Sequence, residues 1–273
     1  MTFPTRTAAL RRILPAVGAA AGLGFLVHGV DVHRAATALR DADPRWLAGG
    51  VVLSAVSLLG GACVWIALVR DRAPHLPART LLMWHFRSLL AGQVLPTGAG
   101  GDAVRGLAVA RMADTGTALG SIALGRVMSA LAMALWGAAG AIALHDAVGA
   151  GVVVTACAFV VALTVALALA LHADSVVGLL GRSRRRTVAR AARGVAPLAD
   201  TLSAWRGRPG LVSLVALMGT AGWGINLAAL TLFARAVGVD AGWQVFAVTI
   251  PVTLAATWLP LSANGIGLRE GIL

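Results

Sequence analysis

Residues 148–172 read VGAGVVVTACAFVVALTVALALALH, a run without an arginine or an acidic residue. A bilayer core of about 30 Å takes about 20 helical residues to cross, so this stretch predicts a transmembrane helix. Three further continuous apolar runs long enough to cross occur at 46–69, 119–144 and 211–237. A shorter run at 12–30 follows several arginines; it has the length of a signal peptide, but with so many spans downstream we expect it to remain as the first crossing.

The composition points the same way. Hydrophobic residues make up 58% of the 273 residues and charged residues only 12%, with a mean hydropathy of +0.83. A water-soluble domain carries about 25% charged residues, so soluble enzymes, disordered chains and coiled coils are excluded. The net charge is +12, and all 23 Lys/Arg positions are arginines, most of which stand between apolar runs. Arginines placed there set topology and meet anionic lipid, so no nucleic-acid partner is expected.

Two further apolar segments are interrupted. Residues 81–101 break at LPTGAGG, and residues 243–267 break at LPLSANGIG. Proline and glycine stop a helix, so each segment is predicted to be a broken hairpin. Eight arginines between 173 and 210 predict a basic cytoplasmic loop, and three near the start predict a cytoplasmic N-terminus. If 81–105 is re-entrant, the arginine distribution agrees with every loop except the mixed loop 31–45, which has three Arg and three Asp. Residues 243–269 then enter from the external face.

The two breaks repeat one pattern. The first reads LPTGAGGDAVR over 95–105, and the second reads LPLSANGIGLR over 259–269, 164 residues later. Leu, Pro, Gly and Arg recur at the same offsets, and entry from opposite sides is typical of the inverted repeats of transporters. The predicted fold is therefore an all-α polytopic membrane protein with about five crossing helices and two Pro/Gly-broken re-entrant hairpins in an inverted repeat.

This pattern suits an anionic substrate, because an arginine at an unwound break can form two parallel hydrogen bonds to a phosphate. We expect Arg105 and Arg269 to contact the phosphate, with Arg87 assisting. Asp102 and Glu270 would hold these arginines or recognise a cationic headgroup. The alternative is that Arg105 and Arg269 only anchor the hairpin ends at the membrane surface. The residues that open the breaks complete the predicted site: Pro96, Gly100, Gly101, Pro260, Gly265 and Gly267.

Other polar residues leave two interpretations open. Arg126 lies in an apolar run, where it either reaches the cytoplasmic interface or serves the site. Asn226, near Gly222 and Gly224, is more often a helix-packing feature than a ligand.

The glycines at 98–101 lack the Lys-Ser/Thr of a nucleotide loop, and the histidines lack metal-ligand spacing. No cofactor, metal site or catalytic residue is therefore expected.

The motifs FRSLLAGQVLPTGAGGDAVRG (86–106) and LPLSANGIGLREG (259–271) resemble those of the lysylphosphatidylglycerol synthase transmembrane-region, or flippase-like, family. The resemblance implies a single transmembrane flippase-like domain over 1–273 in the bacterial plasma (inner) membrane, which moves a lipid between leaflets. Relatives continue through further helices, which implies a naturally short or a truncated chain. No soluble aminoacyl-transfer domain follows, so we expect no enzymatic activity.

The resulting functional hypothesis is a lipid translocase for an anionic or aminoacylated phospholipid. The rival hypothesis is a membrane scaffold or accessory subunit of a separate lipid-modifying or glycosyltransferase enzyme. In the rival, the basic 173–210 loop binds that protein partner and the hairpin arginines are dispensable. A third option, a lipid-linked transferase, would need Asp102 or Glu270 as its catalytic acid.

Overall fold

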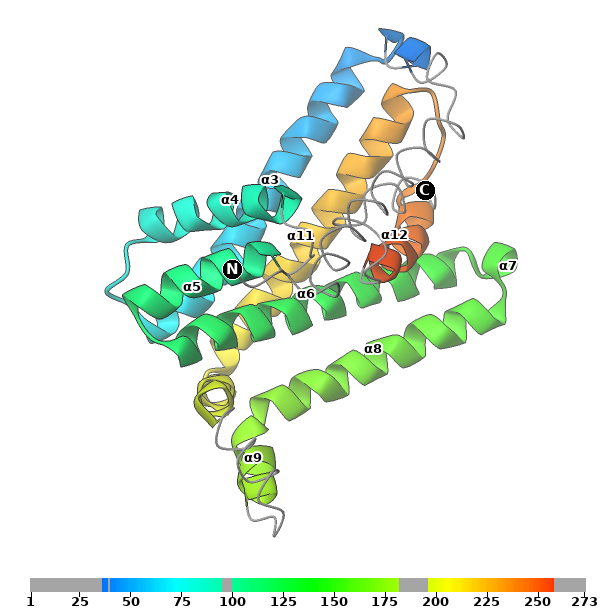
Figure 1. Cartoon of the computed structure of the whole chain (residues 1–273). Helices are drawn as coiled ribbons and strands as arrows, with labels where there is room; N and C mark the ends of the chain where they lie inside the picture. The colour runs from blue at the N-terminus through cyan, green and yellow to red at the C-terminus, as the bar shows by residue number, and fades with distance from the viewer. Residues whose placement is uncertain (1–35, 39, 95–99, 182–195, 258–273) are drawn as a thin grey trace, which may run out of the picture.

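The computed structural model describes residues 36–38, 40–94, 100–181 and 196–257, and over these residues the chain is helical, with no strand (Figure 1). The elements are α3 (Pro44–Arg72), α4 (Ala78–Val94), α5 (Gly100–Met112), α6 (Thr115–Ala143), α7 (His145–Val148), α8 (Ala150–Leu171), α9 (Ala173–Gly181), η1 (Trp205–Gly207), α11 (Pro209–Ala236) and α12 (Trp243–Thr257).

Four helices of the described part, α3, α6, α8 and α11, are long and apolar enough to cross a membrane. They coincide with the predicted runs 46–69, 119–144, 148–172 and 211–237. The predicted first crossing, 12–30, lies outside the described residues. The prediction of an all-α polytopic membrane protein is confirmed.

Helices α3 and α11 form an antiparallel pair that is tied at both ends (Figure 1). At one end, the side chain of Asp43 caps α3 by accepting from the backbone N–H of Arg45, and the Asp43 backbone N–H donates to the Ala236 carbonyl at 2.9 Å. At the other end, the Trp205 indole donates to Asp71 at 3.0 Å, and Arg208 pairs with the same carboxylate. Contacts at both ends fix the register of the pair.

Helix α6 is the centre of the bundle, with contacts to α3, α5, α8, α11 and α12. Its buried positions are mostly Gly, Ala and Ser. A Cβ added to Gly140 would lie 2.9 Å from the Gln244 carbonyl, and one added to Gly120 would lie 2.6 Å from Thr201. Small residues let backbones approach closely, which is how helices associate where lipid is as apolar as the protein.

Helices α4 and α5 pack against each other as the two arms of the predicted first hairpin. Gly101 makes the closest approach, because a Cβ there would lie 2.5 Å from the Ser88 carbonyl oxygen. The break itself, 95–99, lies outside the described residues, as does the second break beyond Thr257. That each hairpin enters and leaves the membrane on the same side therefore remains a prediction.

The predicted loop 173–210 contains helical structure. Besides α9 and η1, residues 196–204 are helical, while 182–195 lie outside the described residues. Trp205 is fully buried against Leu68, Leu124 and Val215, so this segment closes one end of the bundle.

Candidate functional site

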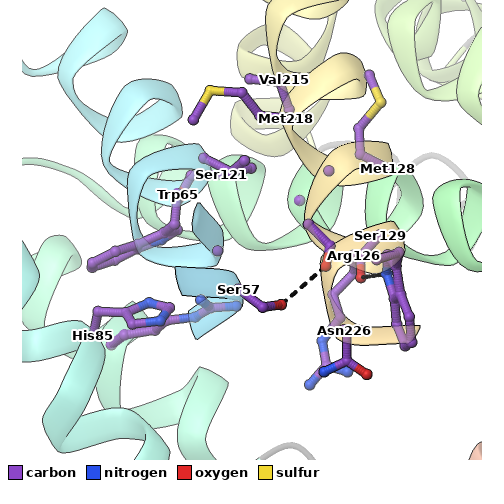
Figure 2. Close-up of a pocket in the computed structure, with 17 residues that line it drawn as sticks. Ser57, Trp65, His85, Ser121, Arg126, Met128, Ser129, Val215, Met218 and Asn226 are labelled. Atoms are coloured by element: carbon purple, nitrogen blue, oxygen red, sulfur yellow. Dashed lines mark hydrogen bonds between the residues drawn. The ribbon is translucent and has the colours of Figure 1, made fainter. Parts of the chain in front are cut away.

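A cavity of about 330 Å³ lies between α3, α4, α5, α6 and α11 (Figure 2). Three of these five helices are candidate membrane spans, and the other two are the arms of the α4–α5 pair. The cavity therefore lies inside the helical bundle. A polar side chain there needs a hydrogen-bond or ionic partner from protein, water or ligand, because lipid chains supply none.

Asp102 holds two arginines at this cavity. Its Oδ1 accepts from Arg105 Nη2 at 2.6 Å, and its Oδ2 accepts from Nη2 and Nε of Arg126, both at 2.6 Å. Arg105 stands one turn after Asp102 on α5, whereas Arg126 comes from α6. Two guanidinium groups and one carboxylate leave the cluster with a net charge of +1. Both arginines line the cavity.

An aromatic wall stands beside Arg105. The Trp65 ring centroid lies 5.4 Å from the Arg105 guanidinium carbon and 6.0 Å from the His85 ring centroid. Three nitrogens of this wall are buried without a hydrogen-bond partner in the described part of the chain: Trp65 Nε1, His85 Nδ1 and Arg105 Nε. An unpartnered buried polar atom costs about 1–3 kcal/mol, so these three nitrogens are a destabilising feature of the protein beside the cavity.

The facing wall carries neutral polar groups from α3, α6 and α11. The Ser57 hydroxyl donates to the Gly222 carbonyl at 3.0 Å, and the Trp223 indole donates to the Ser129 hydroxyl at 3.1 Å. The Asn226 side chain also lines the cavity. Figure 2 shows Trp65 and His85 on one side of the cavity and Ser129 and Asn226 on the other.

Residues 12–273 match the family described as Lysylphosphatidylglycerol synthase TM region. The chain belongs to this family. No curated protein and no solved structure was found that matches it. Membership makes the chain a membrane protein of lipid metabolism or lipid transport.

In this lysylphosphatidylglycerol synthase TM-region protein, the structure brings together part of the predicted site. Arg105 lines the cavity and Asp102 holds it. Gly100 is buried, and Gly101 serves the contact with α4. Arg87 does not line the cavity: it is exposed and stacks on Trp84, 4.9 Å from its ring centroid. The remaining predicted residues lie outside the described part of the chain: Pro96, Pro260, Gly265, Gly267, Arg269 and Glu270.

Two residues of the site were missed from the sequence of this family member. His85 and Trp65 form the wall beside Arg105, although nothing in their spacing pairs them with residue 105. An ionisable residue inside an apolar segment is a functional candidate by default, and this rule would have found His85. Of the two residues whose interpretation was left open, Arg126 pairs with Asp102 and lines the cavity, and Asn226 lines it too. Within the described residues, no group of three His, Cys, Asp or Glu could hold a metal ion.

Proposed function

We propose that this protein moves an anionic phospholipid between the two leaflets of the membrane. One observation carries the proposal: Arg105, Asp102 and Arg126 form a net positive cluster at a cavity between crossing helices. Of the three residues, Arg126 lies on the crossing helix α6. A charged residue inside a crossing helix costs about 2.5–3.5 kcal/mol on insertion scales, so one retained there marks a candidate pathway for a polar group. A phosphate that reaches the cluster would balance its charge.

The geometry supports a phosphate contact at Arg105. Asp102 takes one edge of the guanidinium, and the Trp65 ring covers its face, so its orientation is fixed before a ligand arrives. A fixed planar fork suits two parallel hydrogen bonds to phosphate oxygens. The headgroup would pass along the cavity while the acyl chains stay in the bilayer. No hydrolysable cofactor is needed, so transport would be downhill or coupled to an ion gradient.

We further propose a bacterial inner-membrane location with the N-terminus in the cytoplasm and no enzymatic activity of the chain's own. The arginine-rich residues 173–210 support this orientation, because positive residues stay on the cytoplasmic side. Accessibility labelling of a cysteine introduced at residue 184 would test it, since an inward segment is labelled only after the membrane is permeabilised. Labelling from outside in intact cells would reverse the orientation.

The translocation proposal is tested with the purified protein in liposomes that contain a fluorescent phosphatidylglycerol, with dithionite added outside. Wild type should raise the quenched fraction above the half expected for a sealed vesicle. Arg105→Ala and Arg126→Ala should each lower the rate at least about tenfold, as expected for loss of a charge-assisted contact. Arg111→Ala is the matched control, because Arg111 is an exposed arginine on the same helix α5.

Wild-type rates in both cavity variants would refute the assignment of the site. Absence of movement with wild type, together with co-purification of a lipid-modifying enzyme, would favour the accessory role instead. Arg87→Ala tests the prediction that Arg87 assists the phosphate contact. An unchanged rate is expected, because Arg87 does not line the cavity.

A further inference from the structure

The cavity's chemistry indicates which headgroup it recognises, and this inference rests on the proposed function. We infer that it takes a phosphodiester headgroup ending in uncharged hydroxyl groups, and that it disfavours a headgroup carrying an amine. The family name refers to an aminoacylated lipid, so this conclusion separates the chain's own ligand from that lipid.

The charge of the lining is the first reason. Among the described residues that line the cavity there are two arginines and one histidine but no carboxylate. Asp102 does not line the cavity, and both its oxygens are engaged by the arginines. An ammonium group would therefore find no anionic partner in the described lining and would be repelled by two guanidinium groups, whereas a phosphodiester is attracted.

The hydrogen-bonding groups of the facing wall are the second reason. Ser57 donates its proton to Gly222, so its oxygen is left to accept. Ser129 accepts from Trp223, so its own proton is left to donate. The Asn226 amide offers both functions. A hydroxyl group both donates and accepts, whereas an ammonium only donates, so this wall matches a hydroxyl-bearing end such as glycerol.

The size of the cavity is compatible with such a headgroup. A volume of about 330 Å³ lies at the low end of ligand pockets, which span about 300–1,000 Å³. It is in part made by glycines: Gly61, Gly219 and Gly222 line it, and a Cβ added to any of them would meet nothing within 4 Å. The site thus accommodates a small headgroup, and it can be filled by a side chain without a clash against the described protein.

The test uses the purified full chain in detergent micelles, with bound lipid measured by native mass spectrometry in pairwise competition. The probes are phosphatidylglycerol, phosphatidylmethanol and lysyl-phosphatidylglycerol. Phosphatidylmethanol keeps the phosphodiester charge and lacks hydroxyl groups. Phosphatidylglycerol should bind about tenfold tighter than phosphatidylmethanol, the effect of about one buried hydrogen bond left unmade. Lysyl-phosphatidylglycerol should bind at least about tenfold more weakly than phosphatidylglycerol.

Two variants locate the effect. Asn226→Leu should remove the preference for phosphatidylglycerol over phosphatidylmethanol and leave phosphatidylmethanol binding unchanged. Gly61→Val should weaken all binding by filling the cavity. Gly60→Val is its matched control, because a Cβ on Gly60 also meets nothing within 4 Å but Gly60 does not line the cavity. Equal weakening by both glycine variants would overturn the placement of the ligand.

The outcomes separate this inference from the proposed function. Equal or tighter binding of lysyl-phosphatidylglycerol would overturn the inference, as would equal binding of phosphatidylglycerol and phosphatidylmethanol. Equal rates of movement for the lysyl lipid and phosphatidylglycerol in liposomes would also overturn it while supporting translocation. The expected binding selectivity without any movement would support the site and refute translocation.

Discussion

Helices α6 and α8 lie side by side, and both are long and apolar enough to cross a membrane, yet their surroundings differ completely (Figure 1). Helix α6 buries many of its residues and contacts α3, α5, α8, α11 and α12. Helix α8 is the more apolar of the two and has no buried residue. Hydrophobicity therefore does not decide which helix occupies the centre of this bundle.

Side-chain size accounts for the difference. The buried positions of α6 are mainly Gly, Ala and Ser, whereas α8 exposes large apolar side chains such as Val154, Phe159, Val161 and Leu169. Lipid chains are as apolar an environment for a valine or leucine as another helix is. Burial of apolar area between helices therefore contributes little free energy of association in a membrane. Close packing of small residues supplies the gain instead.

The largest expected effect compares one leucine on each helix. Leu124 of α6 is fully buried among Leu68, Met128 and Trp205, so Leu124→Ala should lower the free energy of unfolding by about 2 kcal/mol or more. Leu169 of α8 is 55% exposed, and lipid or detergent can refill the space that Leu169→Ala leaves. Unfolding in mixed micelles, followed by the fluorescence of the eight tryptophans, measures both. Equal losses would mean that the Leu169 side chain is packed against protein.

A smaller effect is expected from adding a methyl group to each helix. Gly140→Ala places a Cβ 2.8 Å from Ala247 Cβ and 2.9 Å from the Gln244 carbonyl, which should destabilise the α6–α12 contact by about 1–3 kcal/mol. Gly151→Ala on α8 meets nothing within 4 Å, and stability should be unchanged or slightly raised. The thermal midpoint in detergent distinguishes the two, and a tolerated Gly140→Ala would contradict the role of small residues in α6.

The smallest effect concerns how the two helices begin. Asp114 caps α6, accepting from the Thr117 hydroxyl at 2.6 Å and the Thr117 N–H at 2.8 Å, whereas Gly149 before α8 makes no side-chain cap. Asp114→Ala should cost about 1 kcal/mol at neutral pH. Asp146→Ala, at a carboxylate with 91% side-chain exposure, is the control and should cost nothing measurable.

This capping contribution should depend on pH. The hydrogen bonds from the Thr117 side chain and backbone hold the pKa of Asp114 below its usual value of 3.8. A lowered pKa means that the folded state favours the carboxylate, so the stabilisation is complete above pH 3.8 and is lost as the pH falls through the folded-state pKa. The difference between wild type and Asp114→Ala should shrink in that range, and a difference independent of pH would contradict the cap.

Much of the fold was predictable because membrane crossing is a property of single segments. The runs 46–69, 119–144, 148–172 and 211–237 each contain about the number of apolar residues that a bilayer requires, and each is one helix in the structure. The arms of the first hairpin were also recognisable, since a Pro/Gly break separates α4 from α5. How these helices pack was not predictable, because most apolar faces have a similar free energy against lipid and against protein.

The sequence by itself determined the crossing helices and the local pairing of Asp102 with Arg105, because residues three apart on a helix share a face. Only the tertiary structure decided the rest of the site. It brought Arg126 from α6 to the same carboxylate and placed Trp65 and His85 beside Arg105. It also turned Arg87 away from the cavity, since two positions along a helix point to nearly opposite sides and His85 takes the inward one. The physical reason is that a helix's own residues fix only which side chains share a face, while the arrangement of helices in space decides what that face meets.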